Sequence, residues 1–192
     1  THTIITTTLD AMASGGMYDH LGGGFARYSV DEKWLVPHFE KMLYDQALLL
    51  RPYLHASLVL REPRWRQVVQ ETIGYVLRDL RSPEGAFYSA EDADSLDESG
   101  HSHEGHFYVF TPDQVRRIIP MHLMQKALDW YEITDTGNFE GRHHQGCVGL
   151  SGNDKHCQPF EWHRVIASQI WQVMTNTEQR SVDRLTLHRL AN

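Results

Sequence analysis

Cysteine is scarce in this sequence, which has only two, Cys147 and Cys157, among 192 residues. The pair is compatible with one disulfide and equally with a reducing compartment. Two thiols are too few for a zinc site completed by thiolates alone. We therefore expect ordinary thiols, and the sequence predicts neither a bound metal nor a cofactor.

Basic residues and long apolar runs are also in short supply. The chain has 18 lysines and arginines against 25 aspartates and glutamates, a formal net charge of -7, so it lacks the basic surface that nucleic acids and anionic lipids require. No apolar run approaches the roughly 20 residues of a membrane-spanning helix, and the first residues do not resemble a signal peptide. We expect no nucleic-acid or membrane partner and a cytoplasmic location. Because Thr1 opens within a helical pattern, we also expect a fragment of a longer protein.

Helical periodicity and helix-boundary residues extend to about residue 132. Apolar residues three and four apart, with proline starts and glycine ends, are typical of helices. These signals predict helices from Ile4 to Gly15 or Gly16, from Glu40 to Leu60, from Trp65 to Leu80, from Thr111 onward, and from Met121 to Trp130.

Two segments between these helices alternate like strands. "GFARYSVDEKWLV" predicts a hairpin that turns at Asp31-Glu32, and "AFYSAEDA" is expected to pair with "HFYVFT" across an acidic loop. Polar residues gather at the tips of both segments. Helix pairs that alternate with such loops are typical of a helical-hairpin solenoid or toroid.

The stretch "VPHFEKMLYDQ" concentrates groups that can transfer protons. His38, Glu40 and Asp45 can do acid–base work near neutral pH when burial or neighbours tune them. Helical spacing would place Lys41, Tyr44 and Asp45 on one face. The structural alternative makes Glu40 a first-turn acid favoured by the helix dipole, with Lys41 and Asp45 as a surface ion pair.

The stretch "YDHLGGGFARYS" contains three consecutive glycines, which let the backbone pass close to a ligand or to another chain segment. Their spacing does not match the dinucleotide-binding fingerprint. Asp19, His20, Arg27 and Tyr28 flank the glycines and are candidates for ligand contact. The alternative is a tight turn between a helix and a hairpin, with Asp19 and Arg27 paired structurally.

The stretch "SAEDADS" places Glu91, Asp92 and Asp94 within four residues. Two carboxylates in one cavity could act on a sugar as acid and base, whereas the structural alternative is a solvated acidic loop. Calcium is not predicted, because Leu96 and Asp97 break the EF-hand pattern.

The stretch "HSHEGH" brings three histidines close to Glu104 in sequence. Imidazoles at this spacing can meet a metal on a strand or loop. The spacing differs from the H-E-x-x-H pattern of helical zinc sites, and histidines bordered by glycine often face solvent. No metal site is therefore predicted at His101, His103 and His106.

Four motifs in series resemble the YyaL / spermatogenesis-associated protein 20 family over about residues 5–141: "GGMYDHLGGGFARYSVDEKWLVPHFEKMLYDQALL", "GAFYSAEDADS", "EGHFYVFT" and "TGNFEG". The resemblance implies a thioredoxin-like domain followed by an (α/α)6 toroid of the six-hairpin glycosidase type. That toroid is similar to N-acylglucosamine 2-epimerases and unsaturated glucuronyl hydrolases, and its loops form a cleft at one end of the ring.

The expected fold class is all-α: a partial (α/α)6 toroid over 1–141, with short β hairpins at the cleft end. Residues 142–192 form a divergent tail of uncertain structure that resembles nothing in the family. The abrupt loss of pattern at Gly141 motivates the hypothesis of a frameshift or chimeric gene end, which an intact reading frame on resequencing would refute. Exposed helix faces of an incomplete ring would favour a homodimer.

The expected function is that of a carbohydrate-active enzyme, either an epimerase or isomerase or a glycosidase-type enzyme, using general acid–base chemistry. The alternatives are a non-catalytic binding or scaffold module and a truncated, inactive gene product. The catalytic candidates are His38, Glu40, Asp45, Glu91 and Asp92. The candidates for ligand binding, several of them aromatic and suited to sugar rings, are Tyr18, Asp19, His20, Arg27, Tyr28, Trp34, Tyr44 and Asp94.

Overall fold

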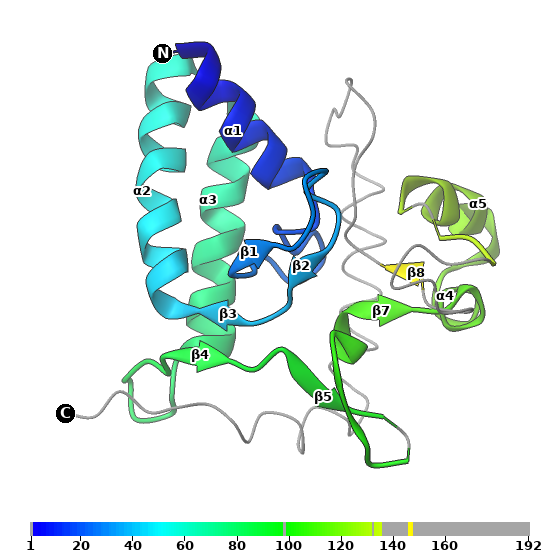
Figure 1. The fold of residues 1–192 in the computed structure, drawn as a ribbon. Coiled ribbons are helices and arrows are strands. Elements are labelled where there is room, and N and C mark those ends of the chain that lie inside the picture. Colours follow the sequence, from blue (N-terminus) through cyan, green and yellow to red (C-terminus); the bar gives the residue numbers. More distant parts are fainter. Residues whose placement is uncertain (1, 98, 132, 136–145, 148–192) are drawn as a thin grey trace.

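The computed structural model describes residues 2–97, 99–131, 133–135 and 146–147 of the chain. The described part is mostly helical, with small two-stranded sheets between the helices (Figure 1). The helices are α1 (His2–Ser14), α2 (Leu43–Leu60), α3 (Pro63–Tyr75), which a π-helical turn (Val76–Leu80) continues, α4 (Pro112–Ile118) and α5 (Met121–Trp130), with a 3-10 turn at His106–Tyr108.

The strands are short and pair only in twos, always antiparallel. None of the described pairs forms a sheet wide enough to be a layer of its own, so the strands serve to fasten loops together. The pairs are β1 (Tyr28–Ser29) with β2 (Pro37–His38), β3 (Lys41–Met42) with β4 (Ala90–Glu91), β5 (Asp94–Leu96) with β6 (Ser102–Glu104), and β7 (Val109–Phe110) with β8 (Gly146–Cys147).

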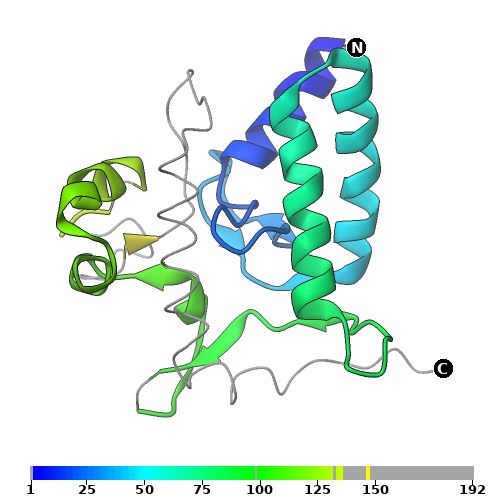
Figure 2. The same ribbon diagram turned by 180° about the vertical axis from the view of Figure 1, so that it is seen from behind.

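The first three helices pack side by side around the larger core (Figure 2). Arg61, in the left-handed conformation, ends α2, and Pro63 starts α3 immediately afterwards, so the two helices form a tight hairpin. The Tyr53 hydroxyl donates to the Leu9 carbonyl at 2.7 Å and joins α2 to α1. The core consists of Leu9, Ala13, Met17, Tyr18, Phe25, Tyr53, Ala56, Trp65, Val68 and Val69.

A second, smaller core lies between α4 and α5. The start of α4 carries the expected cap: Thr111 and Gln114 form a reciprocal capping box, and Pro112 occupies the first turn. Leu21, from the glycine segment, packs against this second core and so connects it to the first part of the chain. The buried members of the cluster are Phe110, Val115, Ile119, Ala127, Tyr131 and Ile133.

The expected helices are confirmed, except that α2 starts at Leu43 rather than at Glu40. Lys41 and Met42 are extended because they pair with β4, in a register that places Lys41 opposite Glu91. The prediction that Lys41 shares a helical face with Asp45 is therefore wrong. Glu40 likewise lies outside the first helical turn.

The first expected hairpin forms, but its turn is wider than predicted. Tyr28 pairs with His38, so the loop centres beyond the predicted Asp31-Glu32 turn. The Asp31 carboxylate holds this loop by accepting hydrogen bonds from the backbone N–H groups of Lys33, Leu35 and Val36. The short side chain of Asp31 thus replaces a tight two-residue turn.

The second expected hairpin is wrong in its pairing. The segment "AFYSAEDA" contributes β4, which pairs with β3 rather than with "HFYVFT". The hairpin that does form joins β5 to β6, and the two residues of β7 pair with β8. Two-residue strands carry too little alternation for sequence to choose among such partners.

The described residues give two sequential helix pairs, α2–α3 and α4–α5, and do not by themselves form a closed ring. Within that described part, no helix is long and apolar enough to cross a membrane. Apart from Gly146–Cys147, the tail predicted over 142–192 lies outside the described residues.

Candidate functional site

Two of the three glycines, Gly23 and Gly24, serve a close approach between chain segments. Gly23 and Gly24 have positive φ angles of 78° and 81°. A Cβ atom on Gly24 would lie 2.5 Å from the Tyr75 ring, and one on Gly23 would lie 2.6 Å from the Glu71 carbonyl oxygen. The glycine loop is therefore pressed onto α3, which is the structural one of the two readings that the sequence allowed.

A buried ion pair holds this loop from the other side. Lys41 Nζ lies 2.7 Å from Asp19 Oδ2 and donates to the Gly23 carbonyl at 3.0 Å. The ammonium group also sits over the Tyr75 ring, 4.3 Å from its centroid. Burial alone would raise the pKa of Asp19, but the Lys41 charge and the hydrogen bonds to the carboxylate together lower it. The pair expected between Asp19 and Arg27 is replaced by this one.

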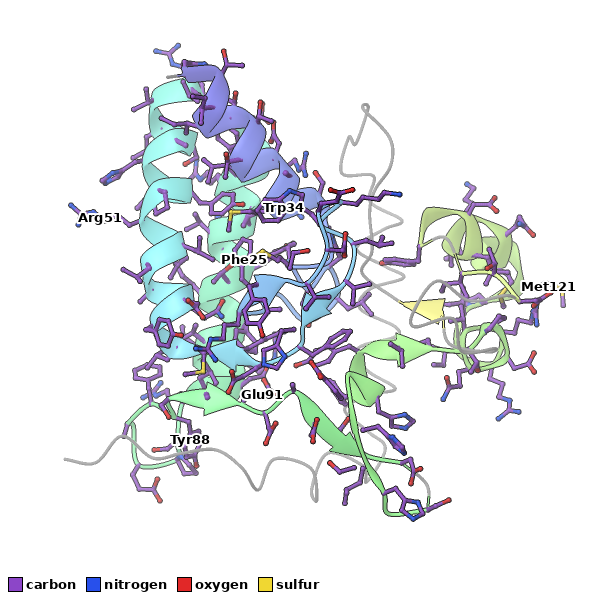
Figure 3. The ribbon with its side chains drawn as sticks, in the orientation of Figure 1. Phe25, Trp34, Arg51, Tyr88, Glu91 and Met121 are labelled. Atoms are coloured by element: carbon purple, nitrogen blue, oxygen red, sulfur yellow. The ribbon has the colours of Figure 1, made fainter. Side chains whose placement is uncertain are left out.

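Glu91, a catalytic candidate, is tied to this buried network. The Tyr75 hydroxyl donates to Glu91 Oε2 at 2.8 Å, and burial, with the negative charge of Glu91, raises the pKa of Tyr75. Tyr75 therefore remains a hydrogen-bond donor at physiological pH. Figure 3 shows Glu91 on β4, near the start of α2 and the end of α3, far from the N-terminus of the chain.

Tyr18, a candidate for ligand binding, is also engaged internally. It is buried in the larger core, and its hydroxyl donates to Glu71 Oε2 on α3. Gln67 donates to the other oxygen of the same carboxylate at 2.7 Å. The arrangement fixes the entrance of the glycine loop against α3.

A second group of charged and aromatic side chains gathers near the surface beside the start of α2. Glu40 accepts from Arg27 at 3.1 Å, and His38 Nε2 lies 3.7 Å from the same Glu40 oxygen. On the other edge of the imidazole, His38 Nδ1 lies 2.7 Å from Glu104 Oε1. We call this group the His38 cluster; its members are Arg27, Tyr28, His38, Glu40, Tyr44, Asp45 and Glu104.

Aromatic rings border the His38 cluster. The Tyr28 ring stacks on the His38 imidazole, with centroids 5.0 Å apart and an interplanar angle of 24°. Tyr44, in the first turn of α2, and then Glu40 raise the pKa of Arg27 above its ordinary value. Tyr28 and Tyr44 both remain exposed.

Asp45 is the acid of the cluster whose charge is disfavoured. Burial raises the pKa of Asp45, and the negative charge of Glu40 adds to the rise, while the Arg27 charge opposes it. Asp45 Oδ2 is buried and has no hydrogen-bond partner among the described residues. Two neighbouring carboxylates thus differ: Glu40 is paired with a cation, and Asp45 is held toward its neutral form.

The remaining site candidates make contacts outside the His38 cluster, although Asp94 stands opposite Glu104 in the β5–β6 register. Asp92 accepts from the backbone N–H of Asp94 at 3.0 Å, and Asp94 accepts from the Ser102 hydroxyl at 3.3 Å. His20 Nε2 lies 3.1 Å from the Gly15 carbonyl oxygen. Trp34 has a left-handed φ of 61° and packs against the larger core beside the end of α1 (Figure 3).

Sequence reasoning missed Glu104 as a partner of His38, because 66 residues separate the two. Its only signal was the dense "HSHEGH" motif, which we weighed as a metal site. In the described residues, no group of three or more histidines, cysteines and acids comes together as a metal-ion site. His101 and His103 lie instead beside the Asp97 carboxylate.

The fold and the site define a mostly helical domain. Its α2–α3 hairpin carries the His38 cluster beside the start of α2. No protein-family model matches the chain. Relatives do: spermatogenesis-associated protein 20 of Homo sapiens is 43% identical over 141 residues, which cover 68% of this chain and 18% of that protein. The Mus musculus protein of the same name is 41% identical over 141 residues, with the same coverage of each chain.

A third relative is an uncharacterized protein of Caenorhabditis elegans, 35% identical over 145 residues that cover 70% of this chain and 20% of the nematode protein. The chain is thus a partial homologue within the YyaL / spermatogenesis-associated protein 20 family. It spans 18% to 20% of the length of these relatives.

Proposed function

We propose that this chain is part of a carbohydrate-active enzyme that works by general acid–base catalysis. The observation that carries the proposal is the group of His38, Glu40 and Asp45, which follow the turn of the first hairpin, beside the Arg27 guanidinium, which precedes it. A base, a carboxylate paired with a cation and an acid of raised pKa in one place are what proton transfer to and from a sugar requires.

The roles follow from the surroundings of each group. His38 is the base, because one ring edge is bound to Glu104 and the other faces Glu40. Asp45 is the acid, because burial raises its pKa. Arg27 and the exposed Tyr28 and Tyr44 rings hold the ligand, since aromatic faces suit sugar rings.

We propose that residues 1–141 of this chain are part of an (α/α)6 toroid. The sequential helix pairs α2–α3 and α4–α5, each followed by strands or loops, are consistent with it. The link from that fold to epimerases and glycosidases is an analogy between architectures. The activity of the whole protein therefore belongs to the proposal, as does a cytoplasmic location.

A scaffold module without catalytic activity is the second candidate. It is favoured by the glycine loop and the Lys41–Asp19 pair, which are bonded within the protein. Glu91 and Tyr18, two of the sequence-based site candidates, are likewise engaged by Tyr75 and by Glu71. A truncated, inactive gene product would share these internal contacts.

A thermal-shift screen against neutral sugars, uronic acids and amino sugars tests the enzyme proposal. A ligand that binds the folded state raises the Tm in a concentration-dependent way. We expect one sugar class to do so for the wild type and to lose its effect in His38→Ala, while the exposed-histidine control His122→Gln keeps it. A cooperative melt that no sugar moves would favour the scaffold.

The Glu91→Gln variant tests Glu91, which belongs to the buried network, separately from the acids of the His38 cluster. The carboxamide oxygen of glutamine can still accept from Tyr75, so the fold should persist. An unchanged ligand response in both His38→Ala and Glu91→Gln would count against the catalytic assignments.

A further inference from the structure

We propose that Glu104 is the positioning residue for His38: it fixes the orientation of the imidazole and its tautomer, with the proton on Nδ1. The inference deepens the proposed function, on which it rests for the role of His38 as a base. Glu104 comes from the β5–β6 hairpin, far from His38 in sequence, and needs no contact with a ligand to act.

The distances distinguish the two edges of the imidazole. His38 Nδ1 and Glu104 Oε1 are 2.7 Å apart, which is the length of a charge-assisted hydrogen bond. An ionised carboxylate can only accept, so the proton must lie on Nδ1. His38 Nε2 lies 3.7 Å from Glu40 Oε2, beyond hydrogen-bond length, so Glu40 does not hold that nitrogen.

A contact on one face of the His38 imidazole also restrains the ring. Tyr28 stands opposite His38 in the β1–β2 register, and its ring stacks on the imidazole. With one face covered by Tyr28 and Nδ1 bound to Glu104, rotation of the imidazole would cost both contacts. Nε2 is therefore kept on the edge that faces Glu40 and, next to it, Arg27.

This arrangement prepares His38 to accept a proton. In the neutral imidazole with a proton on Nδ1, Nε2 carries the free lone pair. A proton that leaves a substrate moves to Nε2, and the resulting cation lies between the Glu104 and Glu40 carboxylates. Glu104 keeps its charge throughout and accepts no proton, as expected for a carboxylate that orients a histidine.

The tautomer can be measured without any substrate. The nitrogen-15 shifts of an imidazole ring, read at an alkaline pH where the ring is neutral, distinguish a proton on Nδ1 from one on Nε2. The chain has 13 histidines, so the His38 signals are assigned by their loss in His38→Gln. We expect the wild-type ring to carry its proton mainly on Nδ1.

Two variants at Glu104 test the cause. Glu104→Ala removes the acceptor, and we expect the proton to move mainly to Nε2, the usual site in a free imidazole. In Glu104→Gln, the carboxamide oxygen can still accept, so most of the Nδ1 population should be retained. The matched control is His103→Gln, the neighbouring residue on β6, whose side chain pairs with Asp97 and should leave His38 unchanged.

The outcomes decide the proposal independently of the enzyme assignment. A wild-type His38 ring protonated on Nε2 would overturn it, as would an Nδ1 proton that persists in Glu104→Ala. A sugar screen with no binder would count against the proposed function and leave the tautomer result standing. The reverse result, ligand binding with an unaffected tautomer, would remove Glu104 alone from the site.

Discussion

Lys41 and Asp19 form an ion pair that is almost wholly withdrawn from water: 2.7 Å separates Nζ from Oδ2, and the Lys41 side chain is 3% exposed. The pair joins strand β3 to the glycine loop, and the Tyr75 ring of α3 lies beneath the ammonium group. Strand β3, the glycine loop and α3 therefore meet at the Lys41 ammonium group. Because a buried ion pair gains little over a well-packed apolar pair, we expect its main effect to be that it specifies this one arrangement of the loop.

We predict that Lys41→Met strongly destabilises the protein. The substitution leaves the Asp19 carboxylate charged, buried and without its cation, which costs about 3 kcal/mol of unfolding free energy. Urea denaturation at neutral pH measures this loss. Adding Asp19→Asn to Lys41→Met should recover part of it, since asparagine keeps the acceptor for the Leu21 and Gly22 N–H groups. A double variant no more stable than Lys41→Met would contradict this account.

Two glycine-to-alanine substitutions should have opposite signs. Gly24→Ala places a methyl group against the Tyr75 ring at a left-handed φ, so we expect a loss of about 2–3 kcal/mol of unfolding free energy. Gly74→Ala, inside α3 with nothing within 4 Å of the new Cβ, should gain about 0.5–1 kcal/mol. Thermal or urea unfolding compares the two. Equal effects would mean that the loop does not press on α3.

The helices were predictable because their signals are local. Pro63, the Thr111-Pro112 start and Gly15 each act within one turn of the residues that they cap or end, and the structure confirms the helices there. The start of α2 was not predictable in this way. Whether Lys41 and Met42 are helical or extended depends on β4, about 50 residues further along, and no local pattern encodes that pairing.

In the candidate site, too, local features were predictable and long-range contacts were not. The density of polar groups in "VPHFEKMLYDQ" pointed to His38, Glu40 and Asp45. In the structure His38 and Glu40 lie 3.7 Å apart, and the charge of Glu40 acts on the pKa of Asp45. Their roles remain predictions. The contact between His38 and Glu104 required the β5–β6 hairpin to be placed, and the partner of Asp19 proved to be Lys41 because β3 turns that side chain inward. Such long-range pairings follow from the assembled fold and not from spacing.

We predict that the exposed face of α2 mediates homodimerisation. This helix is apolar on both sides: Leu48, Leu58 and Val59 are 69%, 68% and 76% exposed, while the opposite side enters the core. A helix of this kind is usually covered on all sides. Sedimentation velocity over a dilution series should show a dimer for the wild type and a monomer for the double variant Leu48→Lys/Leu58→Lys.

The matched control for that experiment is Met121→Lys. Met121 is 92% exposed and lies at the outer side of α5, away from α2 (Figure 3). The control should keep the wild-type oligomeric state. A wild type that is monomeric at every concentration would contradict the predicted homodimer, and a dimer that survives the lysine pair would place its interface elsewhere.

Asp45 should make the protein less stable as the pH rises, which is the opposite of the usual effect of a carboxylate. Its pKa is raised in the folded protein. Its contribution to the free energy of unfolding is therefore fully present below the ordinary pKa of 3.8 and is lost as the pH rises through the pKa of the folded protein. Asparagine does not ionise, so Asp45→Asn removes this loss of stability at higher pH. We expect the variant to exceed the wild type at neutral pH by no more than about 1 kcal/mol, because solvent screens a half-buried carboxylate.

The comparison with Asp31 makes the Asp45 prediction decisive. Burial alone would raise the pKa of Asp31, but the hydrogen bonds from the Val36, Leu35 and Lys33 N–H groups lower it. Its contribution is present above the ordinary value and is lost as the pH falls through the folded value. Asp31→Asn should therefore lower the urea midpoint at pH 7, where Asp45→Asn raises it, and both differences from the wild type should shrink in acid. A lower midpoint for Asp45→Asn at pH 7 would show that the Arg27 charge outweighs burial, and Asp45 would then be an ordinary ionised acid rather than a proton donor.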